Sequence, residues 1–464
     1  MSNVDPDEGQ GATRTELELD PIARDIRARP FLFLVLEAER PLAGGARFAL
    51  ESLDEILVGR GDPGAGRRTS RGTVDGKRRL TVRTGGQFLS KEHALLRRQG
   101  GQAWTIEDLG SRNGVVVNGA QIEGQTALGP GDLISLGRVF FVFELDEAEQ
   151  ADDFDAEDVT VQPVGFLSLL PSLTERLARL RQEAPRNTSI TLVGETGTGK
   201  EVLARAIHGA SGRSGPYLAV NCGAIPRELI QSELFGHVKG AFSGATGSTG
   251  YVRDAQQGTL LLDEIVSAPP AVQIALLRAI QERAVVPVGS TRPHPVDVRF
   301  IAAAQRPLSE AVEAEEFRAD LQGRLEALVF ELPPLRERLE DLGILIATTL
   351  RALGVKEKDN PRLSLPAATR LLRYDWPRNV RELAQAIDVG WGGARNGEIG
   401  DGDLPKPRAQ EGTPHSRLKQ QLIAHLRAAR GNVADVARKM GRTRPLVYHY
   451  LKKFEIDPES FRSG

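Results

Sequence analysis

The sequence predicts a multidomain protein with an N-terminal all-β sandwich, a central α/β domain with a helical lid, and a C-terminal all-α domain. Three observations predict this order. Short apolar runs separated by Gly-rich turns fill residues 29–145. Apolar strands alternate with helical patterns over residues 163–396. Helical periodicity then returns in residues 415–464.

The segments outside these domains are predicted to lack packed structure. Residues 1–28 are polar and acidic and are expected to be disordered. Between Glu144 and Asp158 there are nine acidic residues and no basic one, which predicts a solvated, flexible linker over residues 146–162. Residues 397–414 are rich in Gly, Pro and charge and predict a second linker.

Composition narrows the class of protein. A length of 464 residues fits about three domains. The balance of 60 basic and 62 acidic residues leaves a nucleic-acid partner open, and the single cysteine, Cys222, excludes an intramolecular disulfide framework. Because no apolar run approaches the length that spans a bilayer and the N-terminus is unlike a signal peptide, we expect a cytoplasmic protein with no membrane partner.

A Gly-rich loop follows the apolar strand at residues 190–193 and opens a helical pattern. Backbone N–H groups of such a loop cradle phosphates, and its Lys reaches the outer ones. A second apolar strand ends in Asp263 and Glu264, where one carboxylate can hold Mg²⁺ through water and the other can polarise a water molecule. We expect the nucleotide contacts at Gly194, Glu195, Thr196, Gly197, Thr198, Gly199, Lys200 and Glu201.

The central domain resembles the sigma-54 activator family, the bacterial enhancer-binding proteins that carry an NtrC-type AAA+ ATPase. The resemblance covers about residues 165–395 and rests on the motifs GETGTGKE, NCGAIP, ELFGHVKGAFSGA, GTLLLDE, FRADLQGRL, LPPLRER and WPRNVREL. It implies ATP and Mg²⁺ as cofactors. It also implies a homo-oligomeric ring, expected to be a hexamer built from dimers, that hydrolyses ATP to remodel the closed complex of sigma-54 RNA polymerase.

The resemblance also assigns residues. Asp263 would support Mg²⁺, Glu264 would activate water, and Asn221 would switch Glu264 between hydrolysing and resting states. A cation supplied by a neighbouring subunit stabilises the charge of the transition state, and Arg318 and Arg324 match these arginine fingers. The arginine that senses the nucleotide of its own subunit is Arg381. The sigma-contact loop comprises Gly240, Ala241, Phe242, Ser243, Gly244 and Ala245.

Five positions depart from the family pattern. Ser243 stands where Thr is usual, Ala304 and Gln305 replace a Thr-Asn pair, Arg378 replaces Gly, and Glu201 occupies a position that commonly holds Ser or Thr. Ser243, Ala304 and Gln305 leave an alternative open, namely a DNA-binding regulator that ATP assembles but that no longer activates sigma-54.

The N-terminal domain carries Gly59-Arg60, Ser90-Lys-Glu-His93 and Asn113-Gly114 on predicted loops, and resembles a forkhead-associated (FHA) domain, which binds phosphothreonine peptides. An Arg, a hydroxyl and amide donors that converge from loops suit a phosphate. The expected peptide contacts are Arg60, Ser90, Lys91, Arg112 and Asn113. The resemblance implies a phosphothreonine protein and a Ser/Thr kinase as partners. It leaves a second alternative open, a phosphoprotein-binding adaptor.

Two further expectations concern this domain. His93 is expected to brace the Ser90 loop rather than to touch ligand. The basic insert at residues 61–79 is expected to be a solvated loop. A sharper hypothesis is that a hydroxyl in this insert is phosphorylated and then recognised by an FHA domain of the same ring; the candidates are Thr69, Ser70 and Thr73.

The C-terminal region from Lys406 carries 13 basic and 5 acidic residues. Its pattern of helices separated by Gly-containing turns, with Asn432 as a cap, predicts a helix-turn-helix and resembles the Fis-type domain of the same activator family. The implied partner is enhancer-like DNA. The expected contacts are Arg442, Thr443, Arg444, Tyr448, His449, Lys452 and Lys453.

Overall fold

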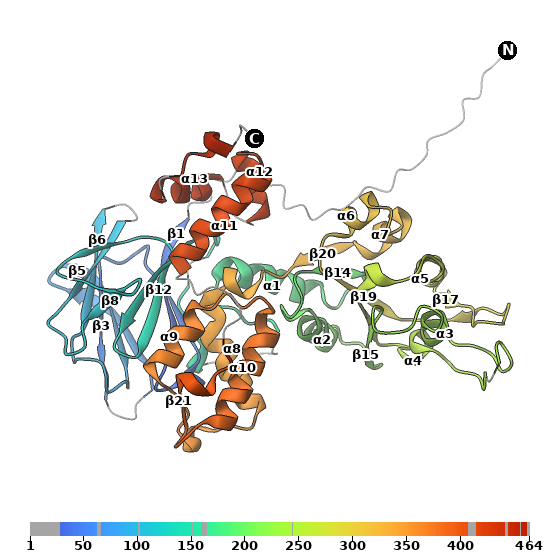
Figure 1. Cartoon of the computed structure of the whole chain (residues 1–464), viewed down its shortest axis with the longest axis horizontal. Coiled ribbons are helices and arrows are strands. Elements are labelled where there is room, and N and C mark those ends of the chain that lie inside the picture. Colours follow the sequence, from blue (N-terminus) through green and yellow to red (C-terminus); the bar gives the residue numbers. More distant parts are fainter. Residues whose placement is uncertain are drawn as a thin grey trace, which may run out of the picture. The chain divides into compact units, whose positions relative to one another are not determined.

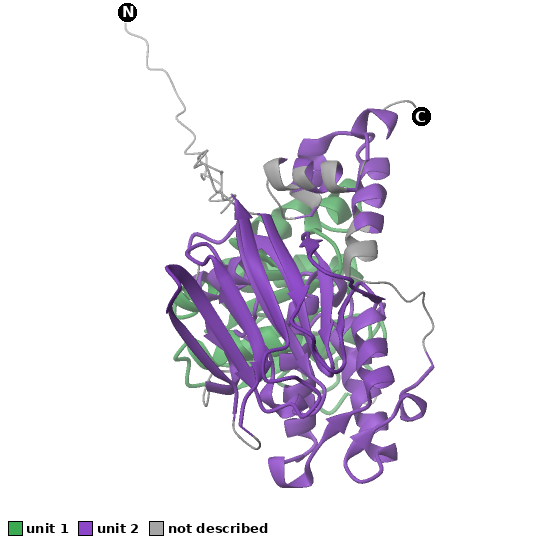
Figure 2. Cartoon of the chain, turned by 90° about the vertical axis from the view of Figure 1, so that its left-hand side faces the viewer, with its two compact units in different colours: residues 1–24, 180–195, 200–332 green, residues 25–179, 196–199, 333–464 purple. Residues whose placement is uncertain are grey.

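The computed structural model, drawn whole in Figure 1, describes residues 28–62, 66–100, 103–150, 152–158, 165–243, 245–406, 414–440, 444–454 and 456–461. The chain forms two compact units (Figure 2). Unit 1 contains residues 180–195 and 200–332, and unit 2 contains residues 25–179, 196–199 and 333–464; residues 1–24, which also group with unit 1, are outside the described part. The segment predicted to be disordered therefore lies outside the described residues, except for Ala28.

Unit 1 is built on a parallel sheet of five strands in the order β15-β16-β19-β14-β20. The strands are β14 (Ile190–Val193), β15 (Tyr217–Asn221), β16 (Thr259–Asp263), β19 (Arg299–Ala304) and β20 (Leu328–Glu331). The helices are α2 (Lys200–Ala210), α3 (Ile230–Phe235), α4 (Tyr251–Asp254), α5 (Pro270–Glu282), α6 (Leu308–Glu313) and α7 (Ala319–Leu325), and a small antiparallel pair is formed by β17 (Ala284–Val285) and β18 (His294–Pro295). The predicted α/β domain is confirmed.

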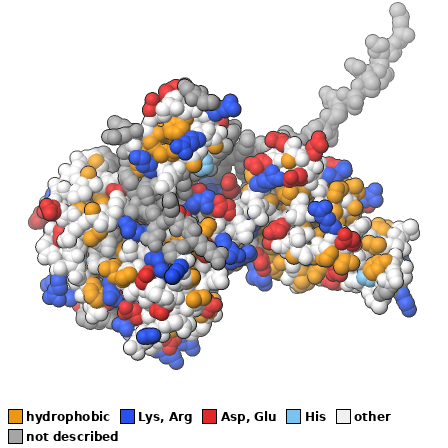
Figure 3. Space-filling view, viewed as in Figure 1, with side chains coloured by type: hydrophobic (Ala, Val, Ile, Leu, Met, Phe, Trp, Pro, Cys, Tyr) orange, Lys and Arg blue, Asp and Glu red, His pale blue; other side chains and the backbone are white. Residues whose placement is uncertain are grey.

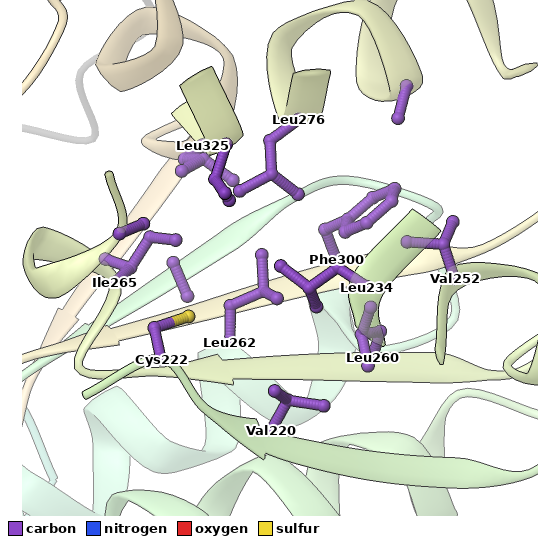
Figure 4. Close-up of a cluster of buried hydrophobic side chains, with 14 of the residues drawn as sticks. Val220, Cys222, Leu234, Val252, Leu260, Leu262, Ile265, Leu276, Phe300 and Leu325 are labelled. Atoms are coloured by element: carbon purple, nitrogen blue, oxygen red, sulfur yellow. The ribbon is translucent and has the colours of Figure 1, made fainter. Parts of the chain in front are cut away.

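The core of unit 1 lies between this sheet and helices α3, α5 and α7. Leu260 and Leu262 of β16 pack in one buried cluster with Leu234, Leu276 and Leu325 (Figure 4). Central strands of a parallel sheet are covered on both faces, so they have continuous apolar sequences rather than alternating ones. The run Thr-Leu-Leu-Leu in β16 fits that environment.

Unit 2 contains the predicted β-sandwich, which is confirmed. Its sheets have the strand orders β13-β2-β1-β12-β11-β8-β9 and β10-β7-β6-β3-β5-β4. The strands are β1 (Arg29–Glu37), β2 (Ala46–Ala49), β3 (Glu55–Arg60), β4 (Arg68–Val74), β5 (Lys77–Thr84), β6 (Ala94–Gly100), β7 (Ala103–Asp108), β8 (Val115–Val117), β9 (Ala120–Gln121), β10 (Thr126–Leu128), β11 (Asp132–Leu136), β12 (Val139–Asp146) and β13 (Phe154–Asp155).

The acidic segment after the sandwich is not the solvated linker that was expected. Phe154–Asp155 forms β13 and pairs with β2. Its carboxylates pair with arginines of the sandwich. Asp155 accepts a hydrogen bond from Arg67 at 2.5 Å, and Asp153 accepts one from Arg71 at 2.5 Å. Ion pairs and strand pairing therefore hold residues 152–158 against the sheet, because the acidic run faces a basic insert that is distant in sequence.

The basic insert is a β-hairpin, not a loop. Strands β4 and β5 are antiparallel, and Asp75 and Gly76 form the turn with φ of 51° and 77°. Asp-Gly is a preferred pair for such turns because both central residues need positive φ. All residues of β4 are exposed, including Thr69, Ser70 and Thr73.

The lid is also in unit 2 and contains α8 (Leu342–Ala352), α9 (Leu365–Arg373) and α10 (Asn379–Gly393). The predicted second linker is wrong for its first part. Glu398–Ile399 forms β22, which pairs in parallel with β21 (Arg362–Leu363), and Ile399 and Leu404 are buried against Gly390. The segment is packed rather than free because it carries these apolar side chains among its Gly and charged residues. Residues 407–413 lie outside the described residues.

Strand β1 of the sandwich is buried on both faces. Leu32 and Leu34 belong to the sandwich core, whereas the alternate residues Phe31, Phe33 and Val35 lie outside that cluster and are 0% exposed. Successive side chains of a strand point to opposite faces. The outer face of the sandwich is therefore apolar and covered, and α8 and the turn before it pack against β1.

The C-terminal domain has three helices at the predicted positions: α11 (Pro414–Ala428), α12 (Val433–Lys439) and α13 (Arg444–Lys453). Asn432 caps α12, because its Oδ1 accepts the N–H of Ala434 at 3.0 Å. Tyr450 of α13 donates its buried hydroxyl to Glu144 of β12 at 3.0 Å. Within the described part of the chain, none of the helices has the length and apolarity required to cross a bilayer.

Candidate functional site

The phosphate loop begins in unit 1 at the end of β14. The Gly194 N–H donates to the carbonyl of Ala304 at 3.1 Å, so the loop starts against the end of β19. Lys200, at the start of α2, is buried, and its Nζ donates to the carbonyls of Gly194 at 2.5 Å and Glu195 at 3.0 Å. Glu201 is exposed and forms an ion pair with Arg205 at 3.4 Å.

The tip of the phosphate loop, residues 196–199, is in unit 2 and touches the lid. Asn379 Nδ2 donates to the Thr196 carbonyl at 3.0 Å. A Cβ on Gly197 would lie 2.3 Å from the carbonyl oxygen of Arg378, and Gly197 has φ of 79°, so glycine is required there on two grounds. The Arg381 N–H donates to the Gly197 carbonyl at 3.3 Å, while its side chain is exposed.

Arg378 fits its turn even though glycine is usual there. Its φ is −109° and its side chain is exposed. That φ is accessible to any L-residue. The departure at this position therefore introduces no backbone strain.

The two predicted carboxylates and Asn221 come together in unit 1. Asn221 of β15 and Asp263 of β16 are register partners on neighbouring parallel strands. Glu264 has φ of 52°, in the left-handed region, and its N–H donates to Asp263 Oδ1 at 3.0 Å. A Cβ on Gly223 would lie 2.5 Å from Glu264 Oε2 and 3.3 Å from Asn221 Oδ1, so both side chains border the same glycine.

Cys222 lies beside this group and is buried. Its N–H donates to the Asp263 carbonyl at 2.9 Å. Burial, together with the charges of Asp263 and Glu264, raises the pKa of the thiol to about 12. The thiol therefore stays protonated and uncharged beside the two carboxylates.

The carboxylates of this site suit Mg²⁺ binding only together with phosphate oxygens. Within the described ranges no cluster of three or more His, Cys, Asp or Glu could hold a metal ion by itself. Mg²⁺ commonly binds through one or two carboxylates together with substrate phosphates and water. Asp263 fits that role because it ends a strand next to Glu264.

The two candidate arginine fingers lie on the surface of unit 1, at α7. Arg318 pairs with Asp320 at 2.6 Å, and this hydrogen bond raises the pKa of the guanidinium. Arg324 lies in the last turn of α7 and is exposed. Neither side chain is packed in the core, so both are accessible to a neighbouring molecule.

The predicted sigma-contact loop projects from unit 1 after α3. Its base is fixed by a bridge between His237 and Ser248 and by the Val238 N–H, which donates to the carbonyl of Val288 at 3.1 Å. Phe242 is 44% exposed, and its ring lies 4.9 Å from the His237 ring. Ser243 is exposed, and Gly244 lies outside the described residues.

An apolar surface accompanies this loop. Hydrophobic side chains reach the surface of unit 1 in Figure 3, and the large exposed ones include Val238, Phe242 and Val286. Ala241 contacts the next loop, because a Cβ on Gly289 would lie 2.9 Å from its Cβ. The two loops therefore support each other and present an aromatic side chain to solvent.

The predicted phosphopeptide residues gather on loops at one edge of the sandwich. The Arg60 N–H donates to the Ser90 carbonyl at 2.9 Å, and Ser90 Oγ accepts the N–H of Arg112 at 3.0 Å. Asn113 Nδ2 donates to the Phe88 carbonyl at 2.7 Å. Arg60, Arg112 and Asn113 are exposed. These contacts bring Arg60, Ser90 and Asn113 together on neighbouring segments, and their role in binding a peptide stays a prediction.

His93 braces the Ser90 loop, as predicted. It is fully buried, its Nδ1 accepts the Ser90 N–H at 3.1 Å, and its Nε2 is 3.0 Å from the Gly114 carbonyl. Because Nδ1 accepts, the ring proton is assigned to Nε2. Gly59 allows the exposed Lys91 to approach, since a Cβ on Gly59 would lie 2.1 Å from the Lys91 carbonyl oxygen.

Three family models match segments of this chain. Residues 168–331 match the sigma-54 interaction domain, residues 57–137 match the FHA domain, and residues 336–421 match an AAA+ ATPase lid domain. The transcriptional regulatory protein GlrR of Escherichia coli (strain K12) is 38% identical over 303 residues, which cover 63% of this chain and 68% of GlrR. The chain belongs to the family of sigma-54-dependent transcriptional activators.

Other relatives in this family differ more in length. AcoR of Bacillus subtilis (strain 168), the acetoin dehydrogenase operon transcriptional activator, is 40% identical over 306 residues, which cover 61% of this chain and 50% of AcoR. The chain thus spans half the length of AcoR. Among solved structures, NtrX from Brucella abortus in complex with ADP is 27% identical to this chain, with a TM-score of 0.47. The match covers 61% of this chain and 68% of the NtrX chain.

The predicted DNA contacts are described only in part. Arg444 and Tyr448 of α13 are exposed. They are four residues apart, so they share one face of the helix. Arg442 and Thr443 lie outside the described residues. The remaining candidates belong to α13, but their side chains are not described: His449, Lys452 and Lys453.

Two residues that contact the phosphate loop were not predicted from the sequence. Asn379 is fully buried and contacts Thr196, and Arg338 donates to the Thr198 carbonyl at 2.6 Å. Asn379 belongs to the motif WPRNVREL and Arg338 to the motif LPPLRER. The motifs were therefore the available signal, but a contact across many residues cannot be read from them.

Proposed function

We propose that this protein hydrolyses ATP with Mg²⁺ to remodel closed complexes of sigma-54 RNA polymerase, and that phosphothreonine binding to its FHA domain controls this activity. One observation carries the hydrolytic part of the proposal. Asn221, Asp263 and Glu264 meet at the ends of neighbouring strands, with Glu264 held in a left-handed conformation beside Gly223. A carboxylate in that position can activate water, and Mg²⁺ would neutralise the phosphate charge.

The assembly that we propose is a ring of several copies. A positive charge supplied from outside a nucleotide site stabilises the transition state of phosphoryl transfer. Arg318, just before α7, and Arg324, in its last turn, are exposed, which supports their action on the ATP of a neighbouring subunit. Arg381 would read the nucleotide of its own subunit, since its backbone contacts Gly197.

We propose that the ring contacts its partner protein through the loop that carries Phe242. An exposed aromatic side chain on a loop with a fixed base suits contact with a protein partner. We propose that sigma-54 polymerase is this partner, that the C-terminal helices bind enhancer-like DNA, and that a Ser/Thr kinase generates the phosphothreonine ligand. With these partners the protein would act in the cytoplasm.

The test is open-complex formation with purified sigma-54 polymerase, a sigma-54 promoter and ATP. The wild type should form open complexes in an ATP-dependent manner, and Phe242→Ala should abolish them while ATP turnover persists. Leu229→Ala is the matched control, since Leu229 is another large exposed apolar residue of unit 1, at 45% exposure. Wild-type ATP turnover and DNA binding without open complexes would contradict the proposal.

That contrary result would favour a second candidate, a DNA-binding regulator that ATP assembles without activating sigma-54. Ala304 supports this candidate, because the end of β19 contacts Gly194 of the phosphate loop through its backbone and carries no hydroxyl there. ATP-dependent oligomers that do not bind sigma-54 would identify it. Phosphopeptide binding without promoter dependence would identify the adaptor alternative.

A further inference from the structure

The sandwich presents two separate surfaces to partners. Its loops carry the proposed phosphopeptide contacts, among them Asn113. The outer face of β1 carries Phe31, Phe33 and Val35, all of them 0% exposed. An apolar face of this kind would mark an interaction surface if it were left open, and here α8 of the lid and the turn before it pack against β1 within unit 2.

The fit between the sandwich and the lid extends to the backbone. A Cβ on Gly343 of α8 would lie 2.2 Å from the carbonyl oxygen of Val35. The Leu363 N–H of β21 donates to the carbonyl of Ala38 at 2.6 Å, next to the end of β1. Such distances leave no room for a side chain or a water molecule between the two elements, so the contact requires one defined arrangement.

A short series of contacts connects this interface to the phosphopeptide loops. Asn113 Nδ2 donates to the Phe88 carbonyl at 2.7 Å. The guanidinium of Arg138 lies 4.3 Å from the centre of the Phe88 ring, within the range of a cation–π interaction. The same Arg138 forms an ion pair with Glu398 of β22, in the lid, at 3.7 Å. Three contacts thus join Asn113 to the lid.

The Phe88 loop also packs closely against Gly137, the residue before Arg138. A Cβ on Gly137 would lie 2.5 Å from the Phe88 carbonyl oxygen, so the chain before Arg138 packs directly on the acceptor of Asn113. An Asn side chain has two N–H donors and one acceptor oxygen. The bond to Phe88 uses one N–H and leaves the other N–H and the oxygen of Asn113 to meet a peptide backbone.

We propose that the ATPase lid is a partner of the FHA domain within the chain, and that lid docking and phosphothreonine binding favour each other. The docked lid holds Arg138 through Glu398, Arg138 holds the Phe88 ring, and the Phe88 carbonyl orients Asn113 for the peptide. Coupling between two sites is reciprocal, so bound peptide stabilises the docked lid. The inference rests on the proposed phosphothreonine binding. It names the lid as the element through which peptide binding affects the ATPase.

The first test concerns docking alone and needs no peptide. In the full chain, Gly343→Ala should place a methyl group against Val35 while favouring the helical state of α8 itself. Gly392→Ala is the matched control, because a Cβ on Gly392 of α10 would meet nothing within 4 Å. Hydrogen exchange should show faster exchange of the Leu363 amide in Gly343→Ala only. Unchanged protection of Leu363 would overturn the docking.

The second test measures affinity for a library of phosphothreonine peptides with randomised flanks, against the unphosphorylated library, by fluorescence anisotropy on the full chain. Glu398→Gln removes the lid end of the series and should weaken binding about 1.5- to 5-fold, the range of a partly exposed ion pair. Asp388→Asn is the matched control, since Asp388 is an exposed acid on α10 of the same lid. It should bind as the wild type does.

A double-mutant cycle separates the series of contacts from a direct electrostatic effect. In an Arg138→Gln background, Glu398→Gln should cause no further loss, because the two residues act through one contact. Equal losses in both backgrounds would overturn the route through Arg138. Equal affinity of Glu398→Gln and the wild type would overturn the coupling and leave phosphothreonine sensing intact. A wild type that does not distinguish the two libraries would overturn both the sensing role and the coupling.

Discussion

Asn379 Nδ2 donates a hydrogen bond to the Thr196 carbonyl at 3.0 Å, and its Oδ1 accepts the N–H of Leu335 at 2.8 Å. One side chain of the lid thereby joins the tip of the phosphate loop to the segment that precedes the lid. Asn379 is fully buried and has φ of 55°, a conformation that Asn tolerates better than most residues. The tip of the phosphate loop and the lid are consequently linked by one buried side chain.

Replacement of this residue should affect stability and nucleotide binding together. Asn379→Ala leaves buried hydrogen-bonding groups without their partner and should lower the free energy of unfolding by about 1–3 kcal/mol. ATP affinity should fall too, because the Thr196 carbonyl loses its donor. Urea unfolding and binding of labelled ATP measure the two effects. Asn379→Gly keeps the backbone conformation accessible, so any recovery relative to Ala reports strain rather than the amide.

Glu264→Gln should separate ATP binding from hydrolysis. Because the amide cannot accept a proton from water, hydrolysis should decrease by about 10²–10⁴-fold, the range of a general base. ATP binding should remain, since Lys200 and the phosphate loop are unaltered. Phosphate release and ATP binding should be measured on the same preparation, with Glu282→Gln as control, an exposed acid at the end of α5. Full hydrolysis by Glu264→Gln would remove Glu264 from the proposed site.

Arg67 should be essential for the position of the acidic segment. Its side chain is 0% exposed and pairs with Glu37 at 2.7 Å and Asp155 at 2.5 Å. Removal of one partner of a buried ion pair costs about 3–5 kcal/mol. Arg67→Met should therefore lower the urea midpoint and expose residues 152–158 to protease. Arg68→Met, with a side chain 74% exposed in the wild type, should do neither.

The free energy of unfolding should decrease in mild acid because the folded chain resists protonation of His208. Its Nδ1 lies 3.0 Å from Thr259 Oγ1, and burial, followed by the charges of Arg213, Arg205 and Arg299, lowers its pKa below the ordinary 6.5. The unfolded chain therefore binds more protons than the folded chain as the pH falls through 6.5, and stability is lost there. Thermal unfolding between pH 5.5 and 7.5 should show a weaker pH dependence in His208→Gln than in the wild type.

Much of the fold could be predicted because the sequence signals were local. The apolar strands of the sandwich, the Gly-rich loop and the strand ending in Asp263 and Glu264 all reflect patterns within a few residues. His93 could be assigned to the Ser90 loop because the two residues are three apart and lie in one motif. The roles of the individual site residues stay predictions.

The errors arose where residues distant in sequence meet. The acidic segment is ordered because Asp155 pairs with Arg67, 88 positions away, and charge composition by itself predicts only solvation. The hairpin at Asp75-Gly76 did have a local signal, the Asp-Gly turn, which the surrounding basic residues obscured. The covered face of β1 also had one, since Phe-Leu-Phe-Leu-Val-Leu does not alternate with polar residues as a half-exposed strand would.

That covered face has a practical consequence for dissecting the protein. A fragment cut at the ends of the sandwich would expose Phe31, Phe33 and Val35 to water, although its interior would be complete. Such a strip of aromatic and aliphatic side chains promotes self-association. Preparations of the isolated sandwich should be prone to aggregation, and the smallest well-behaved piece should include α8. Exchange of this FHA domain for another one would require the lid surface to be redesigned with it.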